Sequence, residues 1–317
     1  MTVPTNSLKH APQNTAVRAK FWNLQRRDTL TAWLLILPSA VVIGAVIFYP
    51  VLRTIYLSFF DFALTRPDAR EFVFLGNYLN FLSDETFWQT IKRTAYFTAV
   101  SVGLELILGI GIALLINAHP PGWKFLRFSI IIPWAVPTIV NGTMWGWIYN
   151  SDYGALNGLL YQLGFIENYV PWLIAPWRAM NLVIVADLWH TVPFVALIIQ
   201  AALAGISSDY YEAAAIDGAT VWQRFWRITL PLLRPAILVV LVIRTVEAFR
   251  VFDIIFIITR GGPAFGTVTI SYLTYLETFR NMAIGSGAAL SFLVSAFILV
   301  IALIYIKFLY TDDLAGT

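Results

Sequence analysis

The sequence contains no cysteine, which excludes disulfide bonds and thiolate metal sites. Charged side chains make up only 12% of the 317 residues, about half the share usual in a water-soluble domain. The histidines His10, His119 and His190 lie far apart and lack the spacing of metal ligands. A net charge of +3 is too small to indicate a nucleic-acid partner. No Gly-x-x-x-x-Gly-Lys-Ser/Thr motif is present, so a P-loop for ATP is not predicted.

Apolar residues are abundant and occur in blocks. They make up 59% of the chain, and the mean hydropathy is +0.72. Each block is about 20 residues long, the length at which a helix crosses a hydrocarbon core of roughly 30 Å. Because lipid offers the backbone no hydrogen-bond partners, every span is predicted to be helical. The sequence therefore predicts an all-α membrane protein with six spans, near 31–58, 95–117, 127–149, 181–204, 235–258 and 285–309.

The distribution of Lys and Arg predicts the orientation of these spans. Basic residues are denser in the segments that are cytoplasmic if the N-terminus lies inside, which favours that orientation. We therefore expect cytoplasmic tails at 1–30 and 310–317, a transmembrane domain at 31–309 and a cytoplasmic loop at 205–234. Prolines within the spans predict kinks rather than ends, because neighbouring helices satisfy the freed carbonyls; they are Pro38, Pro50, Pro133, Pro137 and Pro193.

The loop at 205–234 begins with a predicted short helix. Ser208 or Asp209 is the expected N-cap, and Glu212 follows at capping-box spacing. Alanines after Glu212 leave a surface that a partner can approach closely, and Gly218 ends the helix. Leu230-Pro231 is predicted to return the chain to the bilayer.

This loop resembles the cytoplasmic motif of permeases from binding-protein-dependent ABC importers. The motif is Glu-Ala-Ala, three residues, Gly, nine residues and Ile-x-Leu-Pro, matched here at 212–214, 218 and 228–231. The resemblance implies a coupling helix that docks on an ATPase subunit, which consumes the ATP, whereas this chain catalyses no reaction and binds no cofactor. The implied contact residues are Tyr211, Glu212, Ala213, Ala214, Asp217, Gly218, Ala219, Phe225, Leu230 and Pro231.

Two further segments resemble the carbohydrate-uptake branch of this family. They are Ala248–Asp253 and Thr259–Pro263, at the end of the fifth predicted span. The resemblance implies a multi-pass permease of the inner membrane that imports a sugar by alternating access, such as maltose or trehalose, with glycerol 3-phosphate or another polyol as the alternative. The implied partners are a second permease chain, an ATPase dimer and an extracytoplasmic sugar-binding protein.

Charged residues inside spans are costly, so each marks a candidate site. Glu105, Asp187, Arg244 and Glu247 are of this kind, and spacing allows an Arg244–Glu247 pair and an Arg250–Asp253 pair in one polar stripe. Tryptophans supply flat faces for a sugar ring, and family resemblance raises the weight of the fourth and fifth spans. The predicted pathway residues are Asn141, Trp145, Asp187, Trp189, Glu247, Ala248, Arg250, Val251 and Asp253, with Trp134, Trp147 and His190 as further candidates.

Other interpretations of these residues remain. Buried charge pairs also hold helices together, and tryptophans near span ends also anchor helices at the membrane interface. A membrane-embedded transferase would need a catalytic cluster, and Asp187 with His190 is the nearest approach to one. A secondary transporter is disfavoured because six spans without an internal repeat are few for that design.

Overall fold

The computed structural model describes residue 29 and residues 31–310, so the predicted tails lie almost entirely outside the described residues. The chain divides into two compact units, Met1–Tyr56 and Leu57–Thr317. The described part of the first unit is one helix, continuing as α2 (Tyr49–Ser58). A π-helical turn, η1 (Gly44–Phe48), precedes Pro50, and the Tyr49 N–H donates to the Gly44 carbonyl. The turn falls where proline removes a donor from the regular pattern.

Five helices in the described residues are long and apolar enough to cross a membrane. Besides Thr31–Ser58 they are α4 (Glu85–Asn117), α8 (Pro176–Ala204), Val221–Ile258 and Ile284–Lys307, the last within α14 (Ile284–Tyr310). The fourth of these contains α10 (Val221–Arg224), η3 (Phe225–Thr229), α11 (Leu230–Phe249) and α12 (Asp253–Ile258). The predicted sixth crossing is present only if a bent helix pair counts as one span.

That bent pair corrects the prediction of one kinked helix over 127–149. The segment forms α5 (Trp123–Ala135) and α6 (Thr138–Ile148), which meet at 95°. Val136 is extended at the break, with φ −75° and ψ 128°, as expected for a residue whose helical conformation is hindered by the proline after it. Pro137 therefore ends one helix and begins another, whereas Pro133 and Pro193 lie inside helices.

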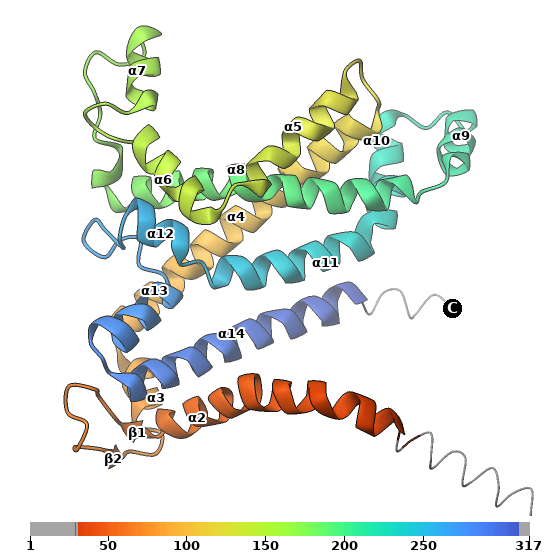
Figure 1. Cartoon of the computed structure of the whole chain (residues 1–317). Helices are drawn as coiled ribbons and strands as arrows, with labels where there is room; N and C mark the ends of the chain where they lie inside the picture. The colour runs from red at the N-terminus through yellow and green to blue at the C-terminus, as the bar shows by residue number, and fades with distance from the viewer. Residues whose placement is uncertain (1–28, 30, 311–317) are drawn as a thin grey trace, which may run out of the picture. The chain divides into compact units, whose positions relative to one another are not determined.

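Short elements join the long helices. Strands β1 (Phe60–Asp61) and β2 (Glu71–Phe72) pair antiparallel, with Phe60 opposite Phe72. The other short elements are α3 (Gly76–Ser83), α7 (Ala155–Gln162), η2 (Trp172–Ile174), α9 (Ser208–Ile216), α13 (Ile270–Tyr275) and η4 (Leu276–Arg280). In Figure 1, α9 and α10 lie beyond one end of α8, and α7 and α12 lie toward its other end. The loop at 205–234 therefore lies at the opposite end of α8 from α7 and α12.

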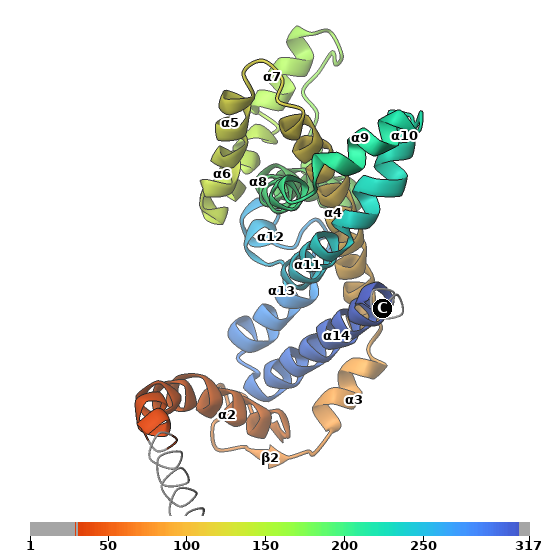
Figure 2. The same cartoon turned by 90° about the vertical axis from the view of Figure 1, so that its right-hand side faces the viewer.

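Helix α8 is central to the second unit and packs most extensively against α4. Figure 2 looks along α8 and shows α4 and α11 beside it. The close approach depends on Gly109 of α4, where an added Cβ would lie 2.5 Å from Val195 Cγ1. Glycine at such a crossing lets two backbones come together, which is how helices commonly pack in lipid.

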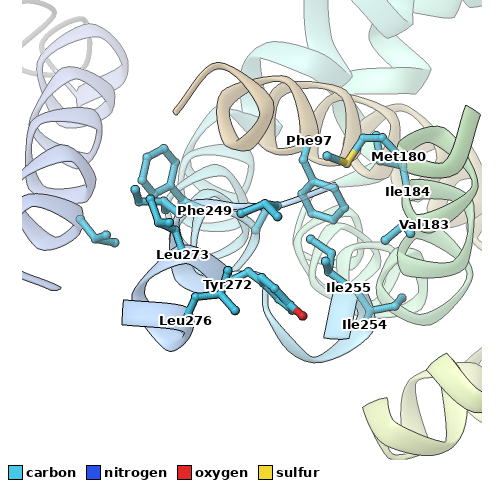
Figure 3. Packing of buried hydrophobic residues seen from close by; sticks show 14 of the residues in the cluster. Phe97, Met180, Val183, Ile184, Phe249, Ile254, Ile255, Tyr272, Leu273 and Leu276 are labelled. Carbon is cyan, nitrogen blue, oxygen red and sulfur yellow. The ribbon is translucent and has the colours of Figure 1, made fainter. Parts of the chain in front are cut away.

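Two apolar clusters form the core around these helices. The first joins α4, α8, α12 and α13, and Figure 3 shows Phe97, Ile184, Ile255 and Tyr272 within it. The second joins α4, α8 and α11 farther along their lengths, through Ala113, Ile199, Leu233 and their neighbours. The two clusters leave a short interval on each of the three helices, and Glu105, Asp187 and Arg244 lie in these intervals.

Candidate functional site

A buried ion pair joins α4 to α11 between the two apolar clusters. Arg244 Nε lies 2.7 Å from Glu105 Oε2, and Arg244 Nη2 lies 2.9 Å from Glu105 Oε1. The Glu105 side chain is completely buried and that of Arg244 is 7% exposed. This bidentate arrangement is the strongest form of an Arg–carboxylate contact, and it connects residues 139 positions apart.

Polar groups from α8 and α11 extend the pair into a junction of three helices. Asp187 Oδ2 lies 3.8 Å from Arg244 Nη2 and 2.6 Å from the Ser101 hydroxyl. The Thr191 hydroxyl lies 2.9 Å from Glu105 Oε1. Glu247 accepts a hydrogen bond from Arg244 Nη1, so the predicted Arg244–Glu247 pair is present. We call Ser101, Glu105, Asp187, Thr191, Arg244 and Glu247 the charged junction.

The charged junction faces a cavity of about 430 Å³, within the size range of roughly 300–1,000 Å³ found for ligand pockets. Six of the nine predicted pathway residues line it: Asp187, Glu247, Ala248, Arg250, Val251 and Asp253. The remaining lining residues are Trp134, Thr138, His190, Thr191, Phe194, Arg244, Phe252 and Ile254. Residues from the fourth and fifth predicted spans therefore meet at one polar cavity.

Three predicted pathway residues do not line this cavity. Asn141 is fully buried and donates from its amide to the Ala186 carbonyl, at 3.2 Å. Trp145 and Trp189 pack edge to face, with ring centroids 6.3 Å apart. These three side chains lie between α6 and α8, and their place on the pathway stays a prediction.

The polar stripe predicted along one continuous fifth helix is interrupted. Helix α11 ends at Phe249, and a new helix begins at Asp253. Arg250 and Asp253 would share a helix face only if the helix were unbroken. No ion pair joins these two described residues. Both side chains instead line the cavity. The stripe is therefore a wall built from a helix end, a loop and a helix start.

The sequence-based set omits several lining residues, including Thr191 and Phe194. Helical spacing already contains a signal for them, because Asp187 and Thr191 are four residues apart, as are His190 and Phe194. Phe194 lies against Trp134, with ring centroids 5.8 Å apart and planes 26° apart. The two rings form an aromatic side to the cavity.

The loop motif lies mainly on α9, with one correction to its cap. Ser207, rather than Ser208 or Asp209, is the N-cap, and its hydroxyl accepts from the Asp209 N–H. A capping box is present one helix later, where Thr220 and Gln223 bond reciprocally at the start of α10. Along α9 no side chain is buried. Its surface is thus available to a partner.

Helix α9 ends beside Gly218 as predicted, whereas the turn predicted at Leu230-Pro231 is absent. Gly218 has φ +75°, which favours glycine, and it lies in the short connection between the C-cap Asp217 and the N-cap Thr220. Leu230 and Pro231 lie inside the helical run from Val221 to Phe249, so they do not turn the chain. The π-helical turn η3 directly precedes Pro231, and there the Leu230 N–H donates to the Phe225 carbonyl.

One hydrogen bond fixes the motif to the helices. The Tyr211 hydroxyl lies 3.1 Å from Thr229 Oγ1. Both residues line a pocket of about 580 Å³, together with Phe225 and residues of α4 and α8. The remaining motif residues, Glu212, Ala213, Ala214, Asp217, Gly218 and Ala219, lie on α9 or in the turn after it.

Residues 105–310 match the family described as "Binding-protein-dependent transport system inner membrane component". The match covers more than half of the chain and includes α9, the cavity and the charged junction except Ser101. The chain belongs to this family. It is a transport subunit of the inner membrane, and the resemblance inferred from the loop motif is confirmed.

Curated relatives of the permease cover most of its length. The trehalose/maltose transport system permease protein MalF of Thermococcus litoralis is 41% identical over 90% of the permease and 95% of the relative. The sulfoquinovosyl glycerol transport system permease protein SmoG of Agrobacterium fabrum is 36% identical over 95% and 100%. The trehalose transport system permease protein SugA of Mycobacterium tuberculosis is 35% identical over 87% of each chain.

A solved structure has the same fold. A chain of a bacterial ABC transporter involved in the import of the acidic polysaccharide alginate aligns with a TM-score of 0.76 and 23% identity. The alignment covers 90% of the permease and 96% of that chain. The predicted all-α permease fold is therefore confirmed.

Proposed function

We propose that the permease is a membrane subunit of an ATP-driven importer that carries a sugar, such as maltose or trehalose, across the inner membrane. The trehalose/maltose and trehalose systems named for two relatives support this substrate class. The cavity also supports it, because carboxylates match sugar hydroxyls and aromatic rings match the apolar face of a pyranose. This proposal includes Asp187, Glu247, Ala248, Arg250, Val251 and Asp253 as pathway residues.

The proposed assembly contains a second permease chain, two ATPase copies and an extracytoplasmic sugar-binding protein. A structure of the alginate transporter is described in complex with a periplasmic protein bound to an alginate pentasaccharide. ATP is hydrolysed by the ATPase subunits, which α9 and the segment after it contact through the ten predicted coupling residues. Both termini of the permease are proposed to lie in the cytoplasm.

The observation that carries the proposal is the helical run from Val221 to Phe249. Its first residue follows the α9 turn, and its last turn lines the cavity through Glu247 and Ala248. A displacement of α9 by a closing ATPase dimer is thus passed to the cavity wall through backbone hydrogen bonds. In the proposed alternating-access cycle, this displacement changes the side of the membrane to which the cavity opens.

The test is import of labelled maltose and trehalose by the complete transporter in proteoliposomes. Gly218→Val strains a residue with φ +75° and no atoms near the new Cβ, and Gly164→Val is its matched control at φ +77° with equally open surroundings. Glu212→Ala is paired with Glu167→Ala, since both glutamates are exposed. We expect the loop variants to lose ATPase association and ATP-driven import, while the controls retain ATPase association.

Import without any ATPase subunit would contradict the proposal and would indicate a secondary transporter instead. Unchanged import and ATPase binding in both loop variants would show that α9 is not the coupling element. If intact transporter hydrolyses ATP but imports neither disaccharide, the proposed substrate is wrong.

A further inference from the structure

Hydrogen-bond acceptors dominate the polar wall of the 430 Å³ cavity. Asp187, Glu247 and Asp253 contribute carboxylates. His190 contributes a fourth acceptor, because its Nδ1 lies 2.9 Å from the Pro133 carbonyl, and a carbonyl can only accept. In the neutral imidazole the proton is then on Nδ1, which leaves Nε2 as an acceptor.

Two donor side chains on the same wall, Arg244 and Thr191, are engaged by neighbouring residues. The guanidinium of Arg244 donates from Nε and Nη2 to Glu105 and from Nη1 to Glu247. The Thr191 hydroxyl is shared between Glu105 Oε1 and the Asp187 carbonyl, at 2.9 and 2.7 Å. Among the described residues that line the cavity, Arg250 is the cation that no ion pair engages.

This balance of groups distinguishes two classes of ligand. A sulfonate, carboxylate or phosphate offers only acceptors and needs several protein donors around it. A hydroxyl group can donate to a carboxylate, so a polyol matches an acceptor-rich wall. The similar proteins do not decide between a neutral and an anionic ligand. One relative is named for trehalose and maltose, and the solved transporter is involved in the import of an acidic polysaccharide.

We propose that the cavity accepts an uncharged polyhydroxylated ligand, rejects its anionic analogue, and owes this selectivity chiefly to Glu247. The inference rests on the proposed function, which places the cavity on the sugar pathway. Glu247 acts in two ways. Its carboxylate adds negative charge to the wall, and it occupies the Nη1 edge of Arg244 that an anion would otherwise use.

Glu247 is also well placed for substitution. Its side chain is 56% exposed, unlike the buried Glu105, so a change to glutamine leaves the bidentate Glu105–Arg244 pair in place. Asp253→Asn is a useful companion, because it removes a lining carboxylate that makes no ion pair with Arg244. Glu167→Gln is the control for charge outside the cavity.

The experiment measures ligand binding to the purified assembled transporter without its extracytoplasmic binding protein. The probes are trehalose and maltose, each beside its 6-phosphate, and the signal is tryptophan fluorescence, since Trp134 lines the cavity. We expect the unmodified protein to bind a neutral sugar about tenfold more tightly than its phosphate, because the lining carboxylates repel the phosphate in a partly hydrated site. Glu247→Gln should reduce that ratio about tenfold, Asp253→Asn should reduce it less, and Glu167→Gln should leave it unchanged.

Equal or tighter binding of the phosphates by the unmodified protein would overturn the inference. A ratio unaffected by Glu247→Gln would also overturn it. If none of the four probes binds while proteoliposomes still import maltose or trehalose, the cavity does not select the ligand, yet the proposed function stands. Failure of both binding and import contradicts the proposed function as well.

Discussion

Arg244 has more ionic partners than any other described residue. Its replacement by leucine would leave Glu105 fully buried without a countercharge. We expect Arg244→Leu to destabilise the protein by about 3–5 kcal/mol, the usual cost of breaking a buried pair from one side. Arg244→Lys should be intermediate, because lysine cannot form the bidentate contact. Denaturant unfolding of the purified protein in detergent measures both changes.

Arg250→Leu is the control for this measurement, since Arg250 is exposed and no ion pair involving it is present in the described chain. Its effect should stay below about 1 kcal/mol. Equal stability losses at Arg244 and Arg250 would mean that the charged junction does not hold the three helices together.

Tyr211 provides a second residue-level prediction. Tyr211→Phe removes the hydroxyl that bonds Thr229 while keeping the ring. A net loss of about 1 kcal/mol is expected, confined to α9, which should raise amide exchange there about fivefold without changing global unfolding. Tyr210→Phe is the matched control, because Tyr210 is 57% exposed. Equal exchange in the two variants would contradict an anchoring role for the Tyr211 hydroxyl.

The sequence predicts which charged residues lie in the spans, but it predicts only one of the ion pairs that they form. The cost of charge in lipid marks Glu105, Asp187 and Arg244 from the sequence alone. The Arg244–Glu247 pair follows from spacing within a helix, whereas the Glu105–Arg244 pair crosses 139 positions and depends on how α4 meets α11. Local spacing contains no information about that contact.

At the scale of elements, the crossing of α4 and α8 gives the sharpest test. A side chain at Gly109 would meet Val195 Cγ1 at 2.5 Å and Val195 Cβ at 2.9 Å. Gly109→Leu should therefore separate the helices and cost about 1–3 kcal/mol through overpacking. Gly111→Leu is the control, since nothing lies within 4 Å of its added Cβ.

Unfolding midpoints of the two glycine variants give the measurement. Helix propensity favours leucine over glycine at both positions, so the control should be unchanged or slightly stabilised. An equally stable Gly109→Leu protein would show that the close contact between α4 and α8 is not required.

Element boundaries were predicted less well than the existence of the elements. Hydropathy locates residues that need lipid, so it places α4 from 95, whereas the helix begins at Glu85 with a polar first part. The sequence predicts only a kink between α5 and α6, because a proline indicates where a helix bends but not by how large an angle. The angle depends on packing against α8 and α12.

At the scale of the whole molecule, the orientation in the membrane is directly testable. The absence of native cysteine means that an introduced thiol is the only one in the chain. We expect Asp152→Cys, in the loop before α7, to react with a membrane-impermeant maleimide in intact cells. Asp209→Cys, on α9, should react only after permeabilisation, and both positions are exposed. The reverse labelling pattern would invert the proposed topology.

The π-helical turn η3 has a geometric consequence for the entire transporter. A π turn contains one residue more than the α-helical pattern, and each residue of an α-helix rotates the chain by about 100°. The segments before and after Phe225–Thr229 are therefore out of phase with each other. Deleting a single residue there would preserve the helical run but move α9 around the axis of α11, relative to the cavity wall. The direction in which α9 faces is thus set by that one extra residue.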